Sequence, residues 1–73
     1  MNLYYTTTEC RVGAADIPAG TRVVRVRTGT GHAYAIADVT MACDCFAGDM
    51  HRAIHYYAWL PEGVDVELRH TLP

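Results

Sequence analysis

The sequence predicts a small α+β domain in which an antiparallel sheet carries one helix on a face, in the order β-β-β-α-β. Three observations lead to this prediction. The chain has 73 residues, which is enough for one hydrophobic core, so residues 1–73 form a single domain. Several segments are rich in Tyr, Thr and Val or alternate between polar and apolar residues, as half-buried strands do. One segment, residues 49–60, shows helical periodicity instead.

The first three strands are predicted from composition and from the turns between them. Residues 3–8 are rich in Tyr and Thr, and the Pro-Gly turn at residues 17–20 leads into the next strand. Residues 21–28 alternate, with Val24 and Val26 on one face and Arg25 and Arg27 on the other. Residues 29–31, Gly-Thr-Gly, form a hairpin loop that leads into a third strand at residues 33–40.

The helix and the last strand complete the predicted fold. Asp49 is a suitable N-cap for a helix over residues 49–60, and Pro61 with Gly63 ends that helix. At 100° per residue, Tyr57 falls on the apolar face with the aliphatic side chains, and Trp59 falls on the opposite face. Residues 64–69 then alternate as a strand that is buried on one side.

A second fold is compatible with the same residues. The segment 17–24, Ile-Pro-Ala-Gly-Thr-Arg-Val-Val, resembles a turn that leads into a strand in small SH3-like barrels. This resemblance covers under a fifth of the chain, and it implies an all-β barrel in which residues 53–60 are extended. The barrel is the alternative to the α+β prediction.

Composition and charge exclude some classes of function. The apolar share of 51% indicates a folded chain, and the formal charge of −2 gives no overall attraction to nucleic acid or to an anionic membrane. We expect no signal peptide and no membrane-spanning segment. Three cysteines are an odd number, and without a secretory signal they favour the reducing cytoplasm.

Two cysteines and two histidines suggest a structural zinc site. Cys43 and Cys45 would share a face of extended chain, and His51 and His55 lie one helical turn apart. Two sulfurs and two nitrogens would complete a closed tetrahedral site. The spacing argues against zinc, since such cysteines are usually separated by two to four residues. We therefore expect no cofactor, with the thiols packed as small apolar groups and the imidazoles solvated.

The sequence supports a catalytic site less well than it supports a zinc site. We therefore predict that the chain is not an enzyme. Cys45 and His51 are the best nucleophile and base pair, but no third orienting group accompanies them. Asp44 and Asp49 are a possible acid-base pair, although Asp49 is more simply a helix cap. The Gly-Thr-Gly loop is too short for a phosphate-binding loop and lacks its Lys.

An arginine stripe supports a nucleic-acid-binding alternative. Arg25 and Arg27 project from one face of their strand, and Arg22 lies nearby in sequence. The chain has no Lys and a negative net charge, which argue against this function. The other interpretation is that the two arginines pair with Asp65 and Glu67 across neighbouring strands.

The outward face of the predicted helix suggests protein binding. Trp, Tyr and Arg are the residues that most often anchor protein interfaces. An exposed Trp on a small domain indicates a partner protein or a homodimer, although Trp59 could instead pack over the sheet edge as core. The candidate partner-binding residues are Trp59, Tyr56, Arg52 and His55, with Glu62, Asp65 and Glu67 as a phosphate-mimicking acidic edge.

The chain also resembles a class of proteins in size and style, without a shared motif. Its small size, the absence of Lys and the absence of targeting or enzyme motifs make it similar to the small anti-CRISPR proteins of phages and mobile elements. That resemblance implies stoichiometric blocking of a host protein complex in the host-cell cytosol. The alternatives are a zinc-stabilised accessory domain of a bacterial or phage assembly and an Arg-stripe nucleic-acid-binding module.

Overall fold

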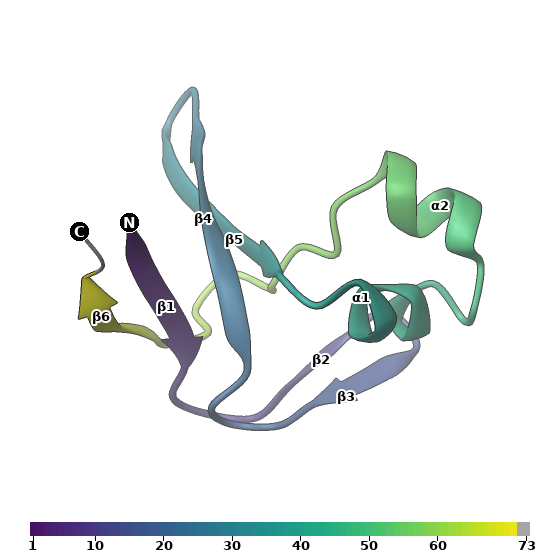
Figure 1. Cartoon of the computed structure of the whole chain (residues 1–73), viewed down its shortest axis with the longest axis horizontal. Coiled ribbons are helices and arrows are strands. Elements are labelled where there is room, and N and C mark those ends of the chain that lie inside the picture. The colour runs from purple at the N-terminus through teal and green to yellow at the C-terminus, as the bar shows by residue number, and fades with distance from the viewer. Residues whose placement is uncertain (72–73) are drawn as a thin grey trace.

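A computed structural model of the chain describes residues 1–71 and confirms the α+β class. Its strands and helices are shown in Figure 1. In chain order they are β1 (Asn2–Thr6), β2 (Cys10–Val12), β3 (Ala15–Ile17), β4 (Arg22–Thr28), β5 (Gly31–Ile36), α1 (Val39–Cys45), α2 (Met50–His55) and β6 (Val66–Thr71).

The main sheet has four antiparallel strands in the order β5-β4-β1-β6. A short segment adds to its β5 edge, because Trp59 forms an antiparallel bridge with Ala35. The Ile36 amide donates to the carbonyl of Ala58 at 3.0 Å, and the Leu60 amide donates to the carbonyl of Tyr34 at 2.9 Å. The sheet does not close on itself within residues 1–71, so the SH3-like barrel is wrong.

The core lies where the sheet meets α1 and the β2–β3 hairpin. Its most buried side chains are Ile17 at 1% exposure and Val23 at 2%, and Ile36, Cys45 and Ala58 pack with them. The β2–β3 hairpin reaches α1 through the amide of Ala14, which donates to the carbonyl of Cys45 at 3.0 Å. Burial of these apolar side chains is the main source of the stability of the fold.

The predicted helix over residues 49–60 is too long. Asp49 is the N-cap as predicted, and its carboxylate accepts from the Arg52 amide at 3.1 Å. The helix ends at His55, since Tyr56 is already extended with φ −124° and ψ 141°. The chain gains backbone hydrogen bonds to β5 by leaving the helix, and these tertiary contacts override the helical periodicity.

Two further elements differ from the predicted order. The third strand ends at Ile36, and Asp38 then caps a helix, α1, over residues predicted to be extended. The β2–β3 hairpin was not predicted, and its turn contains Gly13 at φ +57°. Each strand of that hairpin has only three residues, which is too short for a periodic signal. The last strand is confirmed, shifted to Val66–Thr71, but its predicted burial on one side is wrong, because Val66 is half-buried and the residues after it are exposed.

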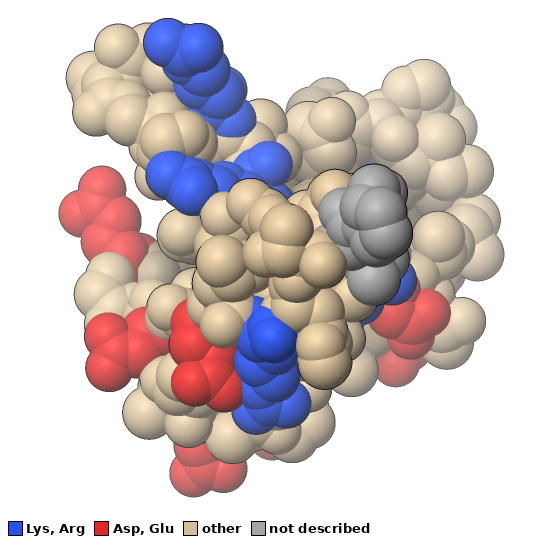
Figure 2. Space-filling view, turned by 60° about the vertical axis from the view of Figure 1, so that its left-hand side comes forward, with Lys and Arg blue, Asp and Glu red and all other residues tan. Residues whose placement is uncertain are grey.

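Both signs of charge occur on the surface. Figure 2 shows basic side chains in the upper part of one face, at the height of the β4–β5 hairpin, with most of the acidic side chains below them. Among residues 1–71, no helix is long and apolar enough to cross a membrane.

Candidate functional site

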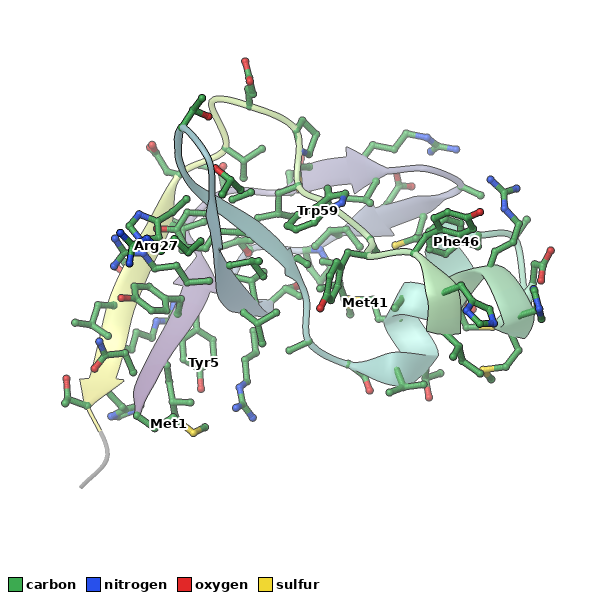
Figure 3. All side chains as sticks on the ribbon, turned by 90° about the horizontal axis from the view of Figure 1, so that it is seen from above. Met1, Tyr5, Arg27, Met41, Phe46 and Trp59 are labelled. Carbon is green, nitrogen blue, oxygen red and sulfur yellow. The ribbon has the colours of Figure 1, made fainter. Side chains whose placement is uncertain are left out.

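An open groove of about 420 Å³ lies between α2, the end of α1 and the extended segment that follows α2. Four of its six lining residues are aromatic. The lining side chains are Phe46, Arg52, His55, Tyr56, Tyr57 and Trp59, which together we call the aromatic groove. Figure 3 shows Phe46 beside the helices and Trp59 over the sheet, with Arg27 at the far end of the molecule.

The aromatic groove is solvent-exposed and internally ordered. Tyr56 is 63% exposed, Tyr57 60% and Trp59 41%. The rings of Tyr57 and Trp59 meet edge to face, with their centroids 4.9 Å apart. The guanidinium carbon of Arg52 lies 5.4 Å from the centroid of the Phe46 ring, within the range of a cation–π contact.

The end of α2 explains how the chain forms this groove. In extended backbone, side chains alternate between faces. Ala58 therefore points into the core, where it is 4% exposed, while Tyr57 and Trp59 both point outward. The bridge between Trp59 and Ala35 fixes this segment on the sheet, so the two rings are held by backbone contacts as well as by each other.

The groove also contains positive charge that no acidic side chain neutralises. Within residues 1–71, the two ion pairs join Arg11 to Asp16 and Arg69 to Glu67, so Arg52 has no carboxylate partner there. His55 lies against His51 on the exposed side of α2, with ring centroids 4.4 Å apart. A ligand of this groove would therefore find apolar rings next to a guanidinium.

The groove contains all four aromatic, basic and imidazole residues predicted to bind a partner: Trp59, Tyr56, Arg52 and His55. It lacks the predicted acidic edge. Glu62 lines a different pocket, under the β4–β5 hairpin. Asp65 is exposed in the loop before β6, and Glu67 pairs with Arg69 at 2.6 Å.

Sequence reasoning missed two of the groove residues, Phe46 and Tyr57. Helical periodicity had placed Tyr57 on the buried face, and extended backbone reverses that assignment. The bridge to β5 that causes the reversal is a tertiary contact, so no local signal could have revealed it. Phe46 is the C-cap of α1, a helix that was not predicted.

The predicted zinc ligands are not brought together as expected. Cys43 and Cys45 lie on helix α1, where positions two apart point about 200° away from each other. Cys45 is buried in the core. Across residues 1–71 there is no group of three or more His, Cys, Asp or Glu side chains that could hold a metal ion. The prediction that Cys43 and Cys45 lie in extended chain was wrong, and the absence of a cofactor stays a prediction, with structural zinc as its alternative.

Burial affects the chemistry of the thiols. All three cysteines are free, and desolvation by burial raises the pKa of Cys45, with the nearby Asp44 carboxylate adding to the effect. Burial also raises the pKa of Cys10. Both thiols stay protonated at neutral pH, and a protonated thiol is a poor nucleophile and a poor metal ligand.

The arginine stripe has partners other than those predicted. Pairing of Arg25 and Arg27 with Asp65 and Glu67 is wrong, because β1 lies between β4 and β6. Arg25 donates instead to the Tyr4 hydroxyl at 2.9 Å, and it contacts His32 on β5. Arg22 projects from the opposite face of β4, since successive strand residues alternate.

Comparison with known proteins gives no relative. No family model, no curated protein and no solved structure matches the chain. Function must therefore be inferred from the chemistry of the side chains.

Proposed function

We propose that this chain is a non-enzymatic protein-binding module and that the aromatic groove is its contact surface. The supporting observation is that Tyr56, Tyr57 and Trp59 are all more than 40% exposed around one groove. Exposed aromatic rings beside an arginine have the composition of interface hot spots. Ile54, 69% exposed on α2, extends the apolar surface.

The groove also indicates the chemistry of the partner. Apolar rings favour an apolar or aromatic side chain, while Arg52 and His55 favour a carboxylate placed next to it. Because Arg52 has no acidic partner within residues 1–71, a carboxylate from outside would form a new ion pair without breaking an existing one. We infer that the partner presents an apolar side chain flanked by Asp or Glu.

Blocking is the mode of action that we propose for this module. A small domain whose groove covers an apolar and acidic segment of a larger complex would act stoichiometrically, without chemistry of its own. The phage origin, the cytoplasmic location and the host complex expected from the resemblance in size and style stay predictions.

A random peptide library displayed on phage tests the proposed partner chemistry directly. Selection on the immobilised chain should enrich peptides that place Asp or Glu near Leu, Ile, Phe or Trp. The groove variant Tyr56→Ala removes an exposed ring, and Leu68→Ala is the matched control on β6, where Leu68 is 50% exposed. Peptide affinity is then measured by fluorescence anisotropy with all three proteins.

We expect Tyr56→Ala to bind the selected peptide at least about tenfold more weakly and Leu68→Ala to bind as the unchanged chain does. Enriched peptides without acidic residues would contradict the partner chemistry, and equal losses in both variants would contradict the location. Light scattering at micromolar concentration tests whether a second copy of the chain occupies the groove instead. A dimer that Tyr56→Ala dissociates would make the occupant a second copy, against the proposal.

A further inference from the structure

A second surface, independent of the aromatic groove, lies where the main sheet opens between β1 and β4. The register between these strands covers two residue pairs, Tyr4 with Val23 and Tyr5 with Arg22. By contrast, β4 and β5 are paired over six residues, up to Thr28. The start of β1 and the end of β4 therefore diverge, and an open pocket of about 490 Å³ lies between them.

Basic side chains dominate this pocket. Its polar lining consists of Asn2 and Tyr4 from β1, Arg22, Arg25 and Arg27 from β4, and His32 from β5, which together we call the basic opening. Among the described residues, 1–71, no Asp or Glu lines it. Neither ion pair within residues 1–71 involves one of these three arginines. A chain of net charge −2 thus concentrates half of its six arginines around one pocket.

Arg25 is held in place at the centre of the basic opening. Its Nη1 donates to the Tyr4 hydroxyl at 2.9 Å, and its Nη2 lies 2.9 Å from Nδ1 of His32. Its guanidinium carbon is 5.6 Å from the centroid of the Tyr4 ring. A guanidinium fixed by two neighbours loses less conformational entropy when it binds a ligand than a free side chain does.

The same contacts leave hydrogen-bond donors available for a ligand. Arginine has no acceptor, so Nδ1 of His32 accepts from Arg25, and Nε2 of His32 then carries the proton. The Tyr4 oxygen accepts from Arg25, which leaves the hydroxyl hydrogen free to donate. A guanidinium has five N–H donors in all, and Arg25 uses two of its nitrogens here. Positive charge and donors together match an oxyanion.

We propose that the basic opening binds a phosphate group through Arg25 and Arg27, with the Tyr4 hydroxyl and His32 as additional donors. Arg25 and Arg27 lie on the same face of β4, and antiparallel pairing places His32 directly opposite Arg27 on β5. Planar guanidinium groups bind phosphate through paired N–H donors. Arg22, on the other face, adds long-range attraction.

Inorganic pyrophosphate is the probe, titrated by calorimetry and followed by amide chemical shifts. Arg25→Gln and Arg27→Gln each remove one charge from the opening. Arg11→Gln is the matched control, because it removes one exposed arginine from the β2–β3 hairpin. Arg25→Lys keeps the charge and removes the planar geometry. Thermal melts of every variant confirm folding.

We expect the unchanged chain and Arg11→Gln to bind pyrophosphate alike, and Arg25→Gln to bind it at least about tenfold more weakly. Arg25→Lys should fall between them. Arg27→Gln should also weaken binding, and within residues 1–71 the Arg27 side chain makes no hydrogen bond that its loss would disturb. An absence of binding by the unchanged chain, or an equal loss in Arg11→Gln, would overturn the proposal.

A single-stranded oligonucleotide of about twelve nucleotides distinguishes two sources of the phosphate. If it displaces pyrophosphate with an affinity that falls as salt rises, the site takes phosphodiesters of a nucleic acid. If it does not compete, the site takes the phosphate of a small molecule. Both results support the phosphate site and assign its source.

Discussion

The aromatic groove and the basic opening use the same sheet in opposite ways. The groove lies at the β5 edge, where an added segment places Tyr57 and Trp59 outward. The opening lies at the internal seam between β1 and β4, where pairing is only two residues long. One surface is formed because the sheet gains a segment, and the other because neighbouring strands diverge.

This difference predicts different kinds of recognition. Binding in the groove depends mainly on apolar contact, which salt affects little. Binding in the basic opening depends on charge, which salt screens. Figure 3 shows Phe46, of the aromatic groove, beside the helices and Arg27, of the basic opening, at the other end of the molecule. A substitution in one site should therefore leave the other unchanged.

The largest expected effect comes from a core substitution that destabilises the fold on which both surfaces depend. Ile17 is 1% exposed and packs in the one core that supports the sheet and α1. We expect Ile17→Ala to lower the free energy of unfolding by about 2–5 kcal/mol, because it leaves a cavity. Urea unfolding followed by circular dichroism measures it. A loss below about 1 kcal/mol would show that the two surfaces do not depend on this core.

A second prediction concerns the contact between the β2–β3 hairpin and α1. A Cβ at Gly13 would overlap the carbonyl oxygen of Cys45, and φ at Gly13 is +57°. Gly48 also has positive φ, at +83°, but nothing lies within 4 Å of its Cβ position. We expect Gly13→Ala to cost about 2–3 kcal/mol and Gly48→Ala about 1 kcal/mol. Equal melting temperatures for the two variants would refute the close approach.

The third prediction compares the loss of the N-cap of α1 with the loss of the N-cap of α2. Asp38 caps α1 and Asp49 caps α2, each by accepting a backbone amide hydrogen bond. Loss of either cap should cost about 1 kcal/mol. Only α2 carries Arg52 and His55, so Asp49→Ala should speed amide exchange in α2 and weaken peptide binding several-fold. Pyrophosphate binding should not change in either variant, and a change would link the two surfaces.

The smallest effects are in the pH dependence of stability, to which Cys45 in the core and Tyr4 in the basic opening contribute with opposite signs. The pKa of Cys45 is raised above 9.0 by burial, so its contribution is complete below pH 9.0 and is lost as pH rises through the folded-state pKa. Hydrogen bonding from Arg25 lowers the pKa of Tyr4 below 10.0. Its contribution is present above pH 10.0 and is lost as pH falls through the lowered value.

Stability measured from pH 8 to 11 tests this difference in sign. Cys45→Ala should reduce the alkaline loss of stability, and Tyr4→Phe should increase it, since the phenolate can no longer form beside Arg25. Parallel pH profiles for both variants and the unchanged chain would contradict the assignment of these two groups.

The fold class could be predicted from the sequence, and so could the first and the last strand of the main sheet along the chain. The strand over residues 21–28 and the Asp49 cap are predicted from local signals, and the structure confirms both, as β4 and as the N-cap of α2. The length of α2 could not be predicted, because backbone bonds between residues 58–60 and β5 determine where it ends. Helix α1 was missed because its cap, Asp38, lay inside a segment that alternates like a strand.

The site residues divide in the same way. Residue type identified four members of the groove: Trp59, Tyr56, Arg52 and His55. They meet there because an extended segment follows the short helix α2, and not because they share one face of a long helix. Tyr57 was missed because the local conformation was wrong. Pairing of Arg25 with an acidic residue of β6 failed because strand order is not encoded locally.

The most direct test of two independent surfaces measures two ligands on three proteins. The selected peptide and pyrophosphate are each titrated into the unchanged chain, Tyr56→Ala and Arg25→Gln, with amide chemical shifts as the readout. We predict that Tyr56→Ala loses the peptide and keeps pyrophosphate, while Arg25→Gln does the reverse. Loss of both ligands in either folded variant, or shifts from both ligands at the same amides, would contradict the account.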